Sequence, residues 1–96
     1  ISKNPSYHLL TNYPNPFNPA TTIRYDVGKP AHIKLSIYSL SGREIKVLEN
    51  SFKPLGSYSV IWDGKDNHNL NLASGIYMCR MQAEDFVRSI KLLLVK

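Results

Sequence analysis

The sequence predicts an all-β domain, an antiparallel β-sandwich of about seven short strands. Apolar and polar residues alternate in several short runs, and this period of two is typical of strands with one face on a core. Turn residues separate the runs at intervals of about 8–12 residues, and no stretch has a helical period. With 96 residues, the chain is long enough for one domain with one modest core and no deep cleft of its own.

The first six residues are polar, contain Pro5 and are interpreted as the end of a linker, so the domain itself is expected to span residues 7–96. The chain starts with Ile1 rather than methionine and shows no basic-then-apolar leader. We therefore interpret it as a piece of a longer protein. Tyr7 to Asn12 is expected to form a short edge strand.

A proline-rich segment, Tyr13 to Pro19, follows and contains three prolines in seven residues. Each proline fixes φ and removes a hydrogen-bond donor, which excludes a helix or a central strand here. The segment is therefore expected to be rigid and extended or turning, with Phe17 plugging one end of the core. The Tyr13–Pro14 bond is a candidate cis bond, although the general preference predicts trans.

Three alternating runs come next, and each is interpreted as a strand with its apolar members facing the core. A glycine–proline break separates the first two, and Ser41-Gly42 supplies a hairpin turn before the third. The expected strands and inward residues are Ala20 to Val27 (Ile23, Tyr25, Val27), His32 to Ser39 (Ile33, Leu35, Ile37) and Arg43 to Leu48 (Ile45, Val47).

The next strand begins at Gly56 and carries Trp62, the only tryptophan, on its inward face together with Tyr58 and Val60. Asp63-Gly64 ends this strand, because glycine accepts positive φ and aspartate can bond its own backbone. A polar, asparagine-rich loop then leads to Gly75, where the chain is expected to return to the sheet.

The last two strands are expected to run from Gly75 to Gln82 and from Phe86 to Lys96. Apolar residues occupy both faces of the final strand, which predicts a strand covered on much of both sides. Cys79 is the only cysteine, which excludes an internal disulfide, and it is expected to be a small buried hydrophobe. The strands and turns together are typical of an immunoglobulin-like sandwich.

The residues that enzymes need are mostly missing. His8, His32 and His68 are far apart without metal-ligand spacing, and neither a nucleophile elbow nor a phosphate-binding glycine loop occurs. We therefore expect no enzyme, no cofactor and no catalytic residues. The longest apolar run is Leu92 to Val95, far short of the ~20 residues of a membrane helix, so no transmembrane segment is expected.

The net charge of +5 favours an acidic partner, such as nucleic acid, lipopolysaccharide or an acidic protein surface, unless it only marks a solvated polar face. The six tyrosines could stack bases as single-strand binders do. Tyr25, Tyr58 and Tyr77 fall on faces already assigned to the core, so nucleic acid is not the expected partner.

A cluster of oxygen-bearing side chains follows Trp62 and is a candidate calcium site, because Ca²⁺ takes six to eight oxygen ligands. The spacing does not match the usual calcium loop, and Lys65 places a cation in its middle. Aspartate and asparagine are also typical of turns that bond to themselves, which is the interpretation we favour. The cluster comprises Asp63, Asp66, Asn67, Asn69 and Asn71.

Three stretches resemble the C-terminal sorting domain, type A, of proteins exported by the type IX secretion system. They are Tyr13 to Tyr25, Ile37 to Ile45, and Trp62 to Asp66 followed by Leu72 to Tyr77 and the ending Lys91 to Lys96. The pattern is also similar to the immunoglobulin-like domain of the flagellar hook-capping protein. The resemblance covers nearly the whole chain from about Tyr7 onward, and the order and spacing of the stretches make it specific.

The resemblance implies a non-catalytic export signal at the C-terminus of a secreted enzyme or adhesin. Such a domain passes through the periplasm and is read by the outer-membrane translocon. A sortase-like peptidase often removes it and attaches the upstream cargo to anionic lipopolysaccharide at the cell surface. Cleavage, if it occurs, would fall at or before residues 1–6. The sequence leaves open the cargo and whether the domain is a monomer or a homodimer.

Carried over residue by residue, the family's recognition elements fall on Pro14, Asn15 and Pro16, on Gly75 and Tyr77, and on the basic-apolar ending from Lys91 to Lys96. The terminal strand is expected to offer a partly exposed edge, which partners can extend by strand addition. Each residue also has a structural interpretation: backbone geometry for Gly75, the core for Tyr77, and edge protection for the lysines.

Two positions depart from the family pattern. Asn69 and Glu84 stand where related sequences usually carry glycine. Asparagine tolerates left-handed backbone geometry. At Glu84, either the turn needs positive φ and costs about 1–2 kcal/mol, or the turn type differs.

The alternative function is a structural or carbohydrate-binding immunoglobulin-like module of a surface or flagellar assembly. An exposed Trp62 or a row of exposed tyrosines would favour it.

Overall fold

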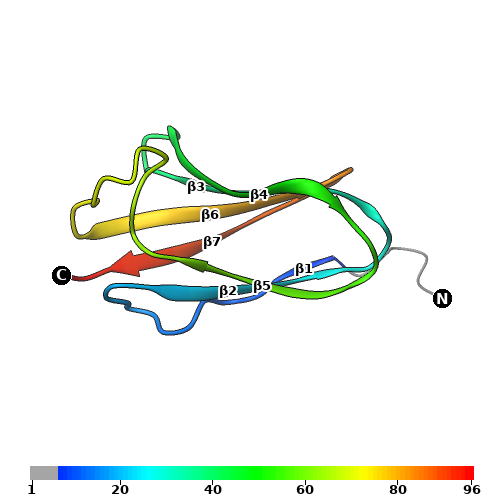
Figure 1. Ribbon diagram of the computed structural model, residues 1–96, viewed down its shortest axis with the longest axis horizontal. Helices are drawn as coiled ribbons and strands as arrows, with labels where there is room; N and C mark the ends of the chain where they lie inside the picture. The colour runs from blue at the N-terminus through cyan, green and yellow to red at the C-terminus, as the bar shows by residue number, and fades with distance from the viewer. Residues whose placement is uncertain (1–6) are drawn as a thin grey trace.

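The computed structural model describes residues 7–96, which form seven strands in two antiparallel sheets packed face to face (Figure 1). One sheet has the strand order β1-β2-β5 and the other β4-β3-β6-β7. The antiparallel β-sandwich that the sequence predicts is therefore confirmed. The strands are β1 (His8–Leu9), β2 (Thr21–Val27), β3 (Ala31–Tyr38), β4 (Glu44–Lys53), β5 (Gly56–Trp62), β6 (Gly75–Ala83) and β7 (Phe86–Leu94).

Within residues 7–96 no helix is long and apolar enough to cross a bilayer. The linker and the cleavage position expected at residues 1–6 lie outside the described residues.

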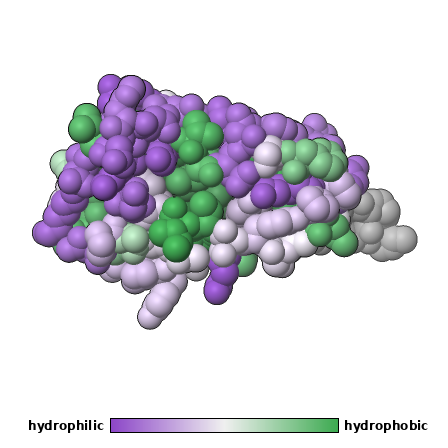
Figure 2. All heavy atoms as spheres, viewed as in Figure 1, coloured by the Kyte–Doolittle hydropathy of each residue, from purple (hydrophilic) through white to green (hydrophobic). Residues whose placement is uncertain are grey.

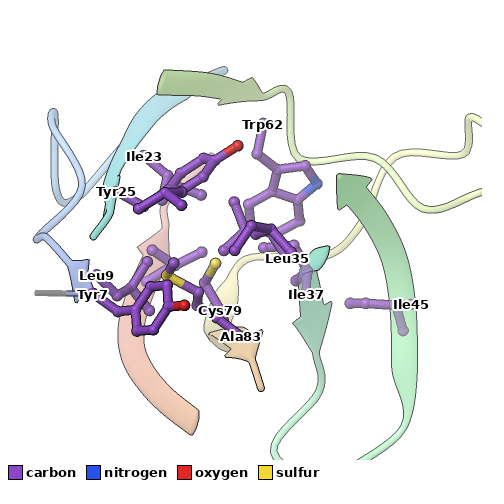
Figure 3. Close-up of a cluster of buried hydrophobic side chains, with 14 of the residues drawn as sticks. Tyr7, Leu9, Ile23, Tyr25, Leu35, Ile37, Ile45, Trp62, Cys79 and Ala83 are labelled. Carbon is purple, nitrogen blue, oxygen red and sulfur yellow. The ribbon is translucent and has the colours of Figure 1, made fainter. Parts of the chain in front are cut away.

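The core lies between the inward faces of the two sheets, and side chains from both converge there (Figure 3). Trp62 has no exposed surface, and its indole Nε1 donates a hydrogen bond to the carbonyl oxygen of Lys65 at 3.0 Å. The Phe17 ring lies 5.4 Å from that of Trp62, so Phe17 plugs this end of the core as expected. Cys79 is a free, buried thiol, as its place on the strand predicts.

Strand β4 differs from the prediction in its register. Two register shifts interrupt its pairing with β3. In one, Ile37 opposes Lys46 while Tyr38 opposes Glu44, which leaves Ile45 over. In the other, Leu35 opposes Glu49 while Ser36 opposes Val47. The residue left over is Leu48, which packs against the core. The expected inward position of Val47 is therefore wrong, because an extra residue shifts the alternation.

Strand β7 is the edge strand of the four-stranded sheet, and only one of its faces is covered. Leu92 and Leu94 point into the core with at most 1% exposure. Leu93 and Val95 are 36% and 46% exposed, so the expected cover on both sides is wrong. The continuous apolar run is what made the two faces indistinguishable in the sequence.

Two turns confirm the backbone geometry at the positions that depart from the family pattern. Asn69 has φ of 65° and Glu84 has φ of 56°, so both residues are left-handed. Glu84 therefore carries the cost expected for a left-handed residue other than glycine.

The proline-rich segment contains three cis bonds, at Tyr13–Pro14, Asn15–Pro16 and Asn18–Pro19. The trans geometry expected for the first of them is wrong. The preference for trans before proline is small enough for the surrounding contacts to decide the isomer.

Candidate functional site

The expected recognition elements, which are far apart in the sequence, meet at one end of the sandwich. Gly75 pairs with Leu94, Tyr77 pairs with Leu92, and Phe17 forms a parallel bridge with Leu94. We call this region the carboxyl end and define it as residues 13–17, 73–77 and 91–96. Figure 1 shows it at the left, where β7 ends beside the start of β6.

The proline-rich segment covers the outer edge of the last residues of β7. The Phe17 amide donates to the Leu93 carbonyl at 2.9 Å, and the Val95 amide donates to the Phe17 carbonyl at 3.0 Å. The Leu93 amide donates to Asn15 Oδ1 at 3.1 Å. Because these backbone groups are already paired, the open edge expected there is closed over Leu93 to Val95.

The same segment is also fixed to the other sheet. Tyr13 and Thr22 exchange backbone hydrogen bonds of 3.0 and 2.9 Å. The Pro14 carbonyl accepts bonds from Thr21 Oγ1 at 2.7 Å and from Asn12 Nδ2 at 3.2 Å. The segment therefore ties the two sheets together, while the rings of Pro14 and Pro16 remain exposed.

Tyr77 and Gly75 hold the start of β6. The Tyr77 ring meets the edge of Trp62 at 5.6 Å, and its hydroxyl donates to the Ala73 carbonyl at 2.6 Å. Burial raises the pKa of Tyr77. Gly75 has φ of +158°, and a Cβ added there would meet no atom within 4 Å. Its backbone geometry, rather than a lack of space, therefore favours glycine. The contacts of Tyr77 and the backbone geometry of Gly75 agree with their structural interpretation.

The outer surface of the carboxyl end is apolar and basic. Ile76 opposes Leu93 across β6 and β7, and these two side chains are 38% and 36% exposed. Lys91 and Lys96 are exposed and form no ion pair with any residue in the range 7–96. We call Ile76, Lys91, Leu93, Val95 and Lys96 the terminal strip. Sequence reasoning found the lysines but missed the apolar members, because alternation did not reveal which face of β7 is solvent-exposed.

The oxygen-rich loop after Trp62 uses its side chains to hold its own backbone. Asp66 Oδ1 accepts bonds from the amides of His68 and Leu70, at 2.9 and 3.0 Å. These bonds, that from Leu70 foremost, lower the pKa of Asp66. Asp63 Oδ1 accepts from the Lys65 amide, and Asn67 Oδ1 accepts from the Val47 amide.

The hydrogen bonds of this loop agree with the turn interpretation, and the calcium site stays a prediction. Within residues 7–96, no group of three or more His, Cys, Asp and Glu residues is arranged to hold a metal ion. Asn69 supplies the left-handed turn, and the Lys65 and Asn71 backbones form an isolated bridge.

The three histidines lie in different places. His8 Nδ1 is 3.2 Å from Asp26 Oδ2, and His32 bonds Asn50 Oδ1 on the other sheet. His68 lines a polar hollow with Arg43, Glu44 and Asp66.

Comparison with known proteins identifies a matching family. A family model described as the secretion system C-terminal sorting domain matches residues 11–96. No curated protein matches the chain.

Two solved structures share the fold. The chain is similar to part of dimeric latent PorU from Porphyromonas gingivalis, with a TM-score of 0.70, 15% identity, and coverage of 99% of this chain and 10% of that one. It is also similar to part of PorZ, a surface component of the type IX secretion system of the same organism, with a TM-score of 0.58 and 20% identity over 90% of this chain and 11% of that one. The chain thus spans about a tenth of each of these proteins, and at such identities the likeness shows the fold alone.

Proposed function

Because the chain belongs to the secretion system C-terminal sorting domain family, we propose that it is a non-catalytic signal that directs an upstream cargo through the outer-membrane type IX translocon. A sortase-like peptidase then removes the domain and anchors the cargo at the cell surface. Membership of the family supports the general role as a secretion signal. The contact between the translocon and the carboxyl end is our own assignment.

The observation that carries this assignment is the meeting of distant elements at the carboxyl end. Asn15 and Leu93 are 78 residues apart and share a hydrogen bond. The proline-rich segment pins the end of β7, so the terminal strip is presented in one conformation and loses little entropy when a partner binds. Recognition there therefore uses exposed side chains rather than strand addition.

The chemistry of the terminal strip defines its partner. Leu93 and Val95 provide exposed apolar surface beside two lysines that form no ion pair within residues 7–96. Such a strip fits an apolar groove with an acidic rim, in which apolar burial supplies affinity and opposite charge supplies orientation.

The path of the chain suits a signal that must remain accessible. His8 in β1 pairs with Asp26, and the adjacent Val27 lies at the end of β2 away from Thr21 and Trp62. The described chain thus enters at the end opposite to the carboxyl end (Figure 1). A cargo joined upstream would therefore not cover the terminal strip.

A reporter fusion tests the charge component of the proposal. A neutral reporter with a periplasmic signal peptide is fused to the chain in a bacterium that has the type IX system, and surface and periplasmic fractions are compared. Lys91→Glu with Lys96→Glu should trap the reporter in the periplasm. Arg24→Glu with Arg43→Glu is the matched control, because both arginines are exposed and form no ion pair within residues 7–96, and this variant should be exported normally. Normal export of a folded Lys91→Glu, Lys96→Glu variant would contradict the assignment.

The carbohydrate-binding alternative is not supported by the aromatic residues that would favour it. Trp62 is fully buried and Tyr25 is 2% exposed. Tyr13, at 78% exposure, lies in the proline-rich segment, apart from the exposed Phe52 on β4.

A further inference from the structure

Four strands form the sheet edges within residues 7–96, and three of these edges are protected. β1 is only two residues long. β7 is covered at its end by Phe17 and carries Arg88 opposite the buried Met81, so that a charge points toward the inner side of this edge strand. Short edges, covering segments and inward charges all discourage pairing with another chain.

β4 is protected in the same ways. Glu49 opposes the buried Leu35, so this charge too lies on the inner side of the sheet, where it pairs with Lys53 at 3.6 Å. The loop after Trp62 covers the start of the strand, because the Asn67 amide donates to the Ile45 carbonyl at 3.0 Å. A bulge at Leu48 interrupts the remaining edge.

β5 has none of these protections. It contains no charged residue and no proline, and its pairing with β2 runs without a bulge from Gly56 to Trp62. Seven uninterrupted residues are long enough to pair with another strand.

The unpaired groups of β5 can be identified from the register. Thr22 exchanges its backbone bonds with Tyr13, so alternate residues of β2 face away from β5. Their opposites, Ser57, Ser59 and Ile61, therefore point their N–H and C=O groups toward the free edge. All three residues are exposed, and no backbone bond joins them to other described residues across that edge.

Apolar surface adjoins this edge. Ile61 is 66% exposed, and the half-buried Tyr58, Val60 and Leu48 lie at the margin of the core. Figure 2, in which β4 and β5 lie toward the viewer, shows a green band that crosses this side of the sandwich from one sheet to the other. Contiguous apolar surface beside an unpaired edge is typical of an interaction site.

We propose that β5 pairs with β5 of a second copy of this chain, antiparallel, with a two-fold axis at Ser59. In this register Ser57 faces Ile61 of the second copy, Ser59 faces Ser59, and Ile61 faces Ser57. The three pairs use every unpaired N–H and C=O group of both strands. The two three-stranded sheets become one sheet of six strands, and Tyr58 packs beside Val60 of the second copy.

A second copy fits this edge because the strand is complementary to itself. An isologous interface requires that a surface tolerate its own image. β5 meets this requirement because it brings no like charges together, although each chain carries a net charge of +5. This pairing is independent of the proposed function, since β5 pairs at its open edge while the terminal strip lies on β6, β7 and the two residues after β7.

Sedimentation equilibrium of the whole chain tests the proposal. As the chain concentration is raised to about 1 mM, a dimer should become detectable. Ser59→Lys should raise the dissociation constant of the dimer by about tenfold or more, because two lysines would meet on the axis. Ser89→Lys adds the same charge at an exposed position of β7 and should leave the dimer unchanged.

Mixing charge variants tests the axis itself. Equal amounts of Ser59→Lys and Ser59→Glu should recover dimer that the Ser59→Lys variant alone does not form. Circular dichroism checks that each variant is folded. The proposal is overturned if the wild-type chain stays monomeric throughout, if Ser59→Lys dimerises as well as wild type, or if the mixture fails to recover the dimer.

Discussion

Trp62 joins two distant segments of the chain at the carboxyl end. It contacts Phe17 from the proline-rich segment and Tyr77 from β6, and its only polar atom is paired. A side chain with both packing and hydrogen bonding satisfied cannot be shortened without leaving a cavity. Trp62 therefore couples the stability of the core to the position of the proline-rich segment and the start of β6.

We expect Trp62→Ala to lower the free energy of unfolding by ~3–5 kcal/mol, because it leaves a large cavity. Urea unfolding followed by circular dichroism measures the change. Phe52→Ala is the control, since Phe52 is 65% exposed and its loss should change the free energy of unfolding by about 0.5 kcal/mol or less. Equal midpoints for Trp62→Ala and wild type would show that the indole does not support the core.

The Cys79 thiol should be unreactive in the folded chain. Burial raises the pKa of Cys79 to about 12, so the thiolate that attacks disulfide reagents is almost absent at pH 8. A colorimetric thiol assay should show slow reaction in buffer and complete reaction in concentrated urea. Complete reaction within the mixing time in buffer would contradict the buried position.

Two asparagines protect sheet edges by the same means. Asn15 accepts a bond from the Leu93 amide at the edge of β7, and Asn67 accepts one from the Val47 amide at the edge of β4. Beside the first bond, the Phe17 amide donates to the Leu93 carbonyl. Beside the second, the amide of Asn67 itself donates to the Ile45 carbonyl. In both places a loop replaces the missing neighbouring strand.

We expect Asn15→Ala to loosen the end of β7. The variant loses one hydrogen bond to an edge amide and should be destabilised by about 1 kcal/mol. Hydrogen exchange at the Leu93 amide should become faster than in wild type. Asn18→Ala, which removes an exposed asparagine from the same segment, is the control, and equal exchange in both variants would contradict the role of Asn15.

The loop held by Asp66 should weaken in acid. The pKa of the Asp66 carboxyl group is lower in the folded chain than the ordinary value of 3.8, so the unfolded state binds the proton more tightly. The carboxylate therefore contributes stability above about pH 4, and this contribution is lost as pH falls through the folded pKa. Melting temperatures from pH 6 to pH 2 should fall less for Asp66→Asn than for wild type. Parallel curves would contradict this role.

Local patterns predicted the strands and the two-sheet fold because alternation, turn glycines and prolines act over a few residues. They also located Phe17 and Trp62 in the core. They failed where distant contacts decide, as at Leu48, whose bulge is visible only in the pairing with β3, and at the exposed face of β7. The bond between Asn15 and Leu93 joins two stretches that no local pattern connects.

On the scale of the whole molecule, the two ends of the sandwich differ in what they present. The carboxyl end gathers the proline-rich segment, the start of β6 and the terminal strip, whereas the chain enters at the other end. The proposed function requires this separation, because a signal that serves unrelated cargoes must stay accessible whatever precedes it. The strand order of the sandwich provides the separation.

In the function proposed here, the export machinery recognises the folded terminal strip through its exposed side chains. The surface fraction of a reporter fused to the Leu93→Ser, Val95→Ser variant of the chain tests this recognition, with Val87→Ser in β7 as the control. All three residues are exposed, so each variant should keep the fold, as circular dichroism would verify. We predict that the double variant accumulates in the periplasm while Val87→Ser reaches the surface as wild type does. Normal surface delivery of the folded double variant would contradict the claim.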